Sequence, residues 1–162
     1  MKHYSELEKK LGVDFKDKSV LIEALTHSSY GNEHNCPFNE RLEFLGDAVL
    51  ELSMSKYLIS KYQMAEGDMT KRRAQAVREE ALDIYAAHLD LPSYLYLGRG
   101  EELTGGRTRK AVIADAFEAA GSKAVEAGKK IINAGVSYNA QLEQYQVALS
   151  TMLGSQEAAD SA

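Results

Sequence analysis

The chain of 162 residues has very little cysteine and proline, and it has no tryptophan. Its one cysteine, Cys36, cannot form an internal disulfide, which excludes a disulfide scaffold and favours a reducing, cytoplasmic setting. No window approaches the roughly 18 apolar residues that a membrane span needs, and the charged N-terminus lacks the apolar run of a signal peptide. We therefore expect a cytoplasmic protein with no membrane partner.

The scarcity of proline leaves room for long helices, with Pro37 and Pro92 as boundaries. Apolar residues repeat at helical intervals and show no alternating strand pattern, so the sequence predicts an all-α fold. We expect helices over 4–11, 20–27 (capped by Ser19), 39–62, 71–90 (capped near Asp68 or Thr70) and 138–153, and one that starts near Thr108. The segments SSYGNEHNCPF and GRGEELTGGRTR are expected to be loops, the second of them mobile.

Acidic residues concentrate in the stretch NERLEFLGDAV, residues 39–49. On a helical wheel, Glu43 and Asp47 fall within roughly 60° of Glu40, and Asp115 and Glu118 share one face of a later helix. The opposite side of the first helix carries the apolar residues Leu42, Leu45, Val49 and Leu52. Acids opposite an apolar stripe are ordinarily a solvated helix face, which is the simplest interpretation of the pattern.

Two observations favour a functional role for these acids. Phe44 falls within about 40° of the acidic face, where an aromatic ring suggests contact with another chain. Glu43 and Asp47 stand at i and i+4, a mildly destabilising arrangement unless a cation neutralises them. Because carboxylate oxygens suit hard divalent ions, Mg²⁺, or Mn²⁺ in its place, is the candidate cofactor.

Four segments of the chain resemble the ribonuclease III family, in the family's order and approximate spacing. They are ALTHSSYGNE, NERLEFLGDAVLEL, AEGDMTKRRAQAV and LGRGEELTGGRTRKAVIADAFEA. The resemblance implies an all-helical endonuclease domain that works as a homodimer. It also implies magnesium-dependent hydrolysis of double-stranded RNA that leaves 5′-phosphate ends, in the processing of ribosomal and messenger RNA.

The same resemblance implies a role for individual residues. The family's metal ligands match Glu43, Asp47, Asp115 and Glu118, of which Asp47 and Glu118 are the most critical for catalysis. Glu40 and Glu66 match supporting acidic positions, the alternative being ordinary surface acids. Phe44 matches a position that packs into the partner subunit, the alternative being a core residue within one chain.

Contacts with RNA are the expected role of Lys71, Arg72 and Arg107, whose cations could hold phosphates of a duplex. The alternative is pairing with nearby glutamates such as Glu101 and Glu102.

The chain departs from the family after Ala119, where FEAAGSKAVEAGKKIINAG has smaller residues than the family's bulky apolar run. We expect one domain over 1–153, unusual after 119, and a disordered tail over 154–162. No lysine or arginine follows Lys130, so we expect no double-stranded-RNA-binding domain in this chain. The departure leaves a second function open, a catalytically inactive module that dimerises or binds double-stranded RNA, although all four acids are retained.

Overall fold

The computed structural model describes residues 4–124 of the chain. In chain order its helices are α1 (Tyr4–Leu11), α2 (Lys18–Ala24), α3 (Ser28–His34), α4 (Glu40–Lys61), α5 (Glu66–Ala76), α6 (Glu79–His88), α7 (Leu91–Tyr94), α8 (Arg99–Leu103), the 3₁₀ turn η1 (Gly106–Thr108) and α9 (Lys110–Ala124). Within this range the only strand-like pairing is an isolated parallel bridge between Thr26 and Tyr96. The described fold is therefore all-α, as predicted.

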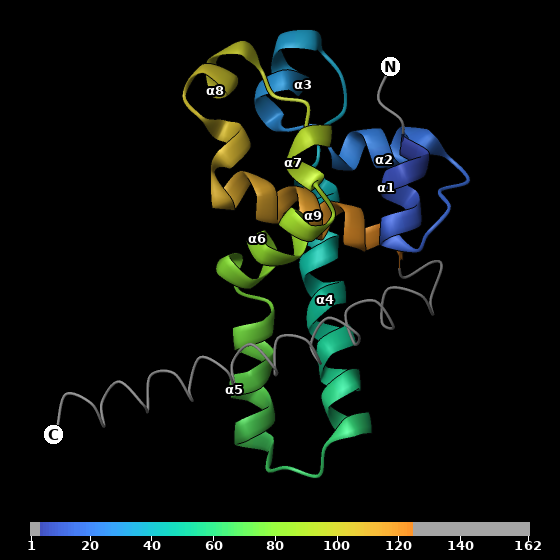
Figure 1. Ribbon diagram of the computed structural model, residues 1–162, viewed down its shortest axis with the longest axis vertical. Coiled ribbons are helices and arrows are strands. Elements are labelled where there is room, and N and C mark those ends of the chain that lie inside the picture. Colours follow the sequence, from blue (N-terminus) through green and yellow to red (C-terminus); the bar gives the residue numbers. More distant parts are fainter. Residues whose placement is uncertain (1–3, 125–162) are drawn as a thin grey trace, which may run out of the picture.

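The longest helices set the shape of this part of the molecule. Helix α9 crosses the upper part of α4, and α4 and α5 form a long antiparallel pair that extends away from the other helices (Figure 1). The predicted helices over 4–11 and 39–62 are confirmed, the second within one residue at each end, and a helix does begin near Thr108. The helix expected over 138–153 and the tail expected over 154–162 lie outside the described residues.

Three expectations about local structure were wrong. The segment expected to be a polar loop contains α3, because the His27 side chain caps the helix by accepting a hydrogen bond from the Ser29 backbone N–H at 3.2 Å. The helix expected over 71–90 begins earlier, at Glu66, and is broken at Arg78, whose backbone is extended. Helix α2 is capped by Asp17, which accepts from the Ser19 N–H, rather than by Ser19.

The glycine-rich segment expected to be mobile is also helical. It forms α8 and η1, and hydrogen bonds attach its start to α3. The Gly98 N–H donates to the Ser29 hydroxyl at 2.9 Å, and the Arg99 N–H donates to the Glu33 carboxylate at 3.0 Å. These bonds join residues nearly seventy positions apart, so no local pattern could have indicated them.

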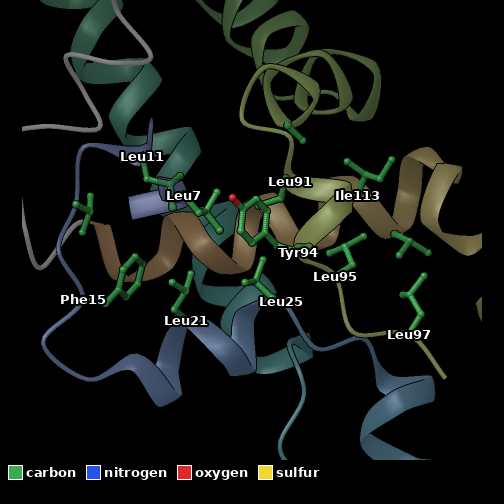
Figure 2. Packing of buried hydrophobic residues seen from close by; sticks show 14 residues of the cluster. Leu7, Leu11, Phe15, Leu21, Leu25, Leu91, Tyr94, Leu95, Leu97 and Ile113 are labelled. Atoms are coloured by element: carbon green, nitrogen blue, oxygen red, sulfur yellow. The ribbon is translucent and has the colours of Figure 1, made fainter. Parts of the chain in front are cut away.

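One main hydrophobic core lies against α9 (Figure 2). Its buried members are Leu7, Leu11, Val13, Phe15, Leu21, Leu25, Ala86, Leu91, Tyr94, Leu95, Leu97, Val112, Ile113 and Ala116. Val112, Ile113 and Ala116 are the members that α9 contributes. The core therefore holds α9 firmly and leaves Asp115 and Glu118, which are half-buried, at its edge.

Helix α4 is oriented differently from the simplest interpretation of its pattern. Leu45 is 48% exposed and Leu52 is 68% exposed, so the stripe opposite the acids is not the buried face. The buried positions of α4 are Gly46, Tyr57 and Leu58. Gly46, which stands beside Asp47, therefore lies against α9, and the apolar residues Leu45 and Leu52 lie toward solvent.

No described helix is both long enough and apolar enough to cross a membrane.

Candidate active site

The crossing of α4 and α9 depends on Gly46, which is buried in the middle of α4. A Cβ atom placed on Gly46 would stand 1.9 Å from the backbone carbonyl oxygen of Glu118 and 2.4 Å from its carbonyl carbon. Only glycine permits so close an approach of two helix backbones. Asp47 follows Gly46 directly, so one contact places an acid of α4 beside an acid of α9.

Electrostatics show that the four predicted ligands share one neighbourhood. Burial, and then the negative charges of three other carboxylates, together raise the pKa of Glu118 to about 7. Those three are, in order of effect, Asp47, Asp115 and Glu43. Burial likewise raises the pKa of Glu43, with Asp115 as its strongest charged neighbour. We call Glu43, Asp47, Asp115 and Glu118 the acidic cluster.

Asp115 links the acidic cluster to groups on other helices. Burial raises the pKa of its carboxyl, while His27 lies close enough for a positive charge on its ring to lower that pKa. Glu79 and Glu40 act in the opposite direction and raise it. Glu40 therefore lies in the same acidic neighbourhood. Glu66 lies at the start of α5, where its carboxylate accepts a hydrogen bond from the Thr70 hydroxyl of the same helix at 2.9 Å.

The acidic cluster forms no ion pair within the described part of the chain. None of the ion pairs formed among residues 4–124 includes one of its four carboxylates. Within the same residues, no three histidine, cysteine, aspartate or glutamate side chains stand close enough to hold one metal ion together. The cluster thus offers the oxygen donors that Mg²⁺ or Mn²⁺ prefers and an uncompensated negative charge, with its carboxylates still apart.

The predicted cationic contacts divide into two groups. Lys71 and Arg72 are exposed on α5, and the Arg72 guanidinium lies 5.5 Å from the centre of the Tyr62 ring. Arg107 instead forms a bidentate pair with Glu102, at 2.8 and 2.6 Å, and Arg109 pairs with Glu101. For these two arginines the structure shows the alternative, pairing with glutamates.

Phe44 is 84% exposed and is not a core residue of this chain. Leu45, Leu52 and Ile59 are exposed on the same helix, so an apolar side of α4 is left uncovered by residues 4–124.

Two residues of the site were missed by the sequence analysis. Gly46 carried an available signal, because a glycine inside a long helix costs about 1 kcal/mol against alanine and needs a packing reason. Glu79 carried none, because its proximity to Asp115 arises from the packing of α6 on α9.

The segments that build this site match known proteins. A family model described as Ribonuclease-III-like matches residues 17–130. Ribonuclease 3 of Geobacillus thermodenitrificans is 55% identical over 120 residues, which are 72% of this chain and 49% of that protein. Ribonuclease 3 of Listeria monocytogenes is 55% identical over 122 residues, which are 73% of this chain and 53% of that protein. The chain spans about half the length of the curated relatives that it matches.

A solved structure supports the same assignment. The nuclease domain of ribonuclease III from Campylobacter jejuni superimposes with a TM-score of 0.73 at 37% identity, over 88% of this chain and 97% of that one. The study of that domain concerns structural flexibility in a region involved in dimer formation. With the family model covering more than half of the chain and the crossing of α4 and α9 carrying all four acids, this chain belongs to the ribonuclease-III-like family.

Proposed function

We propose that this chain is the nuclease domain of a divalent-metal-dependent endoribonuclease that hydrolyses phosphodiester bonds in double-stranded RNA. The observation that carries the proposal is the Gly46 contact, which brings Asp47 and Glu118 together from helices about seventy residues apart. The single cysteine supports a reducing compartment such as the cytoplasm, where processing of ribosomal and messenger RNA takes place.

In this mechanism Glu43, Asp47, Asp115 and Glu118 would hold Mg²⁺, or Mn²⁺ in its place. The ion, when bound, supplies Lewis-acid chemistry at the scissile phosphate, because it makes a water more acidic and neutralises charge on the phosphate oxygens. Glu118, with a pKa of about 7, retains a proton part of the time near neutral pH and must release it to become a ligand. The attacking water oxygen bonds to phosphorus, the bond to the 3′ oxygen breaks, and the products are a 3′-hydroxyl and a 5′-phosphate.

A cleavage assay tests this proposal directly. The wild-type chain is incubated with long duplex RNA at low salt, with and without Mg²⁺, beside Glu118→Gln and a control, Glu6→Gln, whose side chain is 68% exposed on α1. We expect Mg²⁺-dependent products from the wild type and from Glu6→Gln, and a loss of at least about 100-fold for Glu118→Gln. Binding of duplex RNA without Mg²⁺-dependent products at high protein concentration would favour the inactive binding module instead.

We also propose that a second copy of the chain covers the apolar side of α4 that Phe44, Leu45, Leu52 and Ile59 form. The support is their exposure on one helix, together with a matching domain in which dimer formation has been studied. Sedimentation should show a weaker dimer for Phe44→Ala than for Leu103→Ala, which removes a side chain 79% exposed on α8. Equal dimerisation of the two variants would contradict this interface.

For the RNA contact, Lys71 and Arg72 on α5 remain the proposed phosphate contacts. Lys71→Ala should weaken duplex binding for all sequences and reduce the slope of log affinity against log salt by about 1. Because A-form RNA is recognised mainly through its shape and 2′-hydroxyls, we expect little sequence preference. An unchanged salt slope would remove Lys71 from the contact surface.

A further inference from the structure

The guanidinium of Arg107 forms all of its hydrogen bonds with groups of the same chain. Its Nη1 donates to the Pro92 carbonyl oxygen at 2.5 Å and to the Leu95 carbonyl oxygen at 3.2 Å, and its Nη2 donates to Leu95 at 3.3 Å. The Nε and Nη2 groups donate to the two carboxylate oxygens of Glu102 at 2.8 and 2.6 Å. An arginine has five N–H donors, so these five hydrogen bonds leave none for a phosphate.

The partners of Arg107 belong to separate pieces of the fold. Pro92 lies in α7, Leu95 is the residue at which α7 ends, and Glu102 lies in α8. Arg107 itself lies in η1, so its side chain joins three short elements that have little regular structure of their own. A planar, bidentate guanidinium fixes direction as well as distance, which lysine cannot do.

The joined elements lead directly into α9. Gly106 is buried against Glu101, whose Cγ would lie 2.5 Å from a Cβ on that glycine. The Arg109 carbonyl accepts the Ile113 N–H at 3.2 Å and so belongs to the first turn of α9. Asp115 follows Ile113 by two residues. The segment that Arg107 holds leads into the start of α9. Its position therefore affects where Asp115 lies in the acidic cluster.

We propose that Arg107 is a positioning residue for the acidic cluster: it clamps α7, α8 and η1 together and thereby fixes the N-terminal end of α9. The proposal rests on the proposed function of that cluster and replaces the sequence-based expectation that Arg107 contacts RNA. Arg99 offers a matched comparison in the same segment, because it is exposed and its side chain makes no hydrogen bond to the described residues. Removing Arg99 takes away the same charge without releasing the clamp.

The test compares Arg107→Ala, Arg107→Lys and Arg99→Ala in three measurements. Hydrogen exchange reports the amides of residues 108–115, calorimetry measures Mn²⁺ affinity, and steady-state cleavage of duplex RNA separates kcat from KM. For Arg107→Ala we expect faster exchange, Mn²⁺ affinity lower by about 10-fold or more, and kcat lower by about 100-fold with KM within about 2-fold. Arg107→Lys should recover only part of each loss, and Arg99→Ala should match the wild type in exchange and Mn²⁺ affinity.

The proposal is overturned if Arg107→Ala exchanges and binds Mn²⁺ as the wild type does. It is also overturned if Arg107→Ala loses RNA affinity and salt dependence while kcat stays unchanged, since that is the result expected of a phosphate contact. Should Arg107→Ala unfold, Glu102→Gln keeps the bonds of Arg107 to Pro92 and Leu95 and should give an intermediate increase in exchange; exchange equal to the wild type would again overturn the clamp. If the wild type neither binds Mn²⁺ nor cleaves RNA, the proposed function fails, and the exchange comparison decides the clamp by itself.

Discussion

Replacing Glu118 by glutamine removes one charge from the acidic cluster and leaves the size of the side chain almost unchanged. The folded chain raises the pKa of Glu118 from 4.5 to about 7, so folding favours the protonated carboxyl. Each pKa unit corresponds to about 1.4 kcal/mol, which gives about 3 kcal/mol as an upper bound. Because Glu118 is only half-buried, solvent screening reduces this to about 1–2 kcal/mol.

The sign follows from the direction of the shift. A carboxyl whose pKa is higher in the folded chain binds its proton more tightly there. The contribution of this protonation to the stability of the folded chain is therefore fully present below the ordinary pKa of 4.5. That contribution is lost as the pH rises from 4.5 to about 7. At about pH 8, Glu118→Gln should therefore be more stable than the wild type by about 1–2 kcal/mol, and at about pH 4 the difference should vanish.

Urea unfolding in the presence of a chelator measures this difference at both pH values, with Glu6→Gln as the control for loss of an exposed carboxylate. Adding Mg²⁺ at the higher pH supplies a second, opposite effect. A ligand present at about 100 times its Kd stabilises a folded protein by about 2.7 kcal/mol. Mg²⁺ should therefore raise the free energy of unfolding of the wild type more than that of Glu118→Gln, so that the wild type becomes the more stable of the two. A variant that is less stable than the wild type without Mg²⁺ at about pH 8, or equal stabilisation of both by Mg²⁺, would refute the reasoning.

Further predictions concern packing. Gly46→Ala should destabilise the chain by about 1–3 kcal/mol and reduce cleavage by about 100-fold, because its Cβ would overlap the Glu118 backbone and force the two helices apart. Gly121→Ala is the matched control on the same pair of helices: its Cβ would meet its nearest neighbour at 3.8 Å, so we expect about 1 kcal/mol of stabilisation in urea unfolding and no loss of activity. Glu8→Ala should cost about 1–3 kcal/mol, because buried Glu8 accepts the Phe15 N–H at 2.8 Å; an unchanged midpoint in urea would contradict that.

The parts of the fold that the sequence predicted correctly depend on local interactions. Helix α4 combines good helix formers over 22 residues without an internal proline, so its existence and ends follow from composition and spacing. The acids were selected as candidates because their spacing puts them on single helix faces. Both inferences use residues within a few turns of one another, which is the range over which helix propensity and side-chain neighbours act.

The features that the sequence missed depend on contacts between distant segments. Helix α3 is short and polar, and it persists because the His27 cap and the bonds from Gly98 and Arg99 hold it. The glycines of the segment GRGEELTGGRTR favour flexibility. The segment is nevertheless ordered, because Arg107 donates to Glu102 and to the Pro92 carbonyl, and Arg109 pairs with Glu101. The sequence left the orientation of α4 open, because the helical wheel shows which residues share a face but not which face is covered.

The small residues after Glu118 illustrate the relation between packing and site. In the sequence, the residues after Ala119 stand out as a departure from the family's bulky apolar run. In the structure Ala119 and Ala120 are fully buried and form a cluster with Ala24, against which Leu42 packs. The Gly46 contact brings the four carboxylates into one neighbourhood. Burial and the mutual repulsion of these carboxylates raise the pKa of Glu118 and oppose folding at neutral pH, and a bound divalent cation would relieve that repulsion.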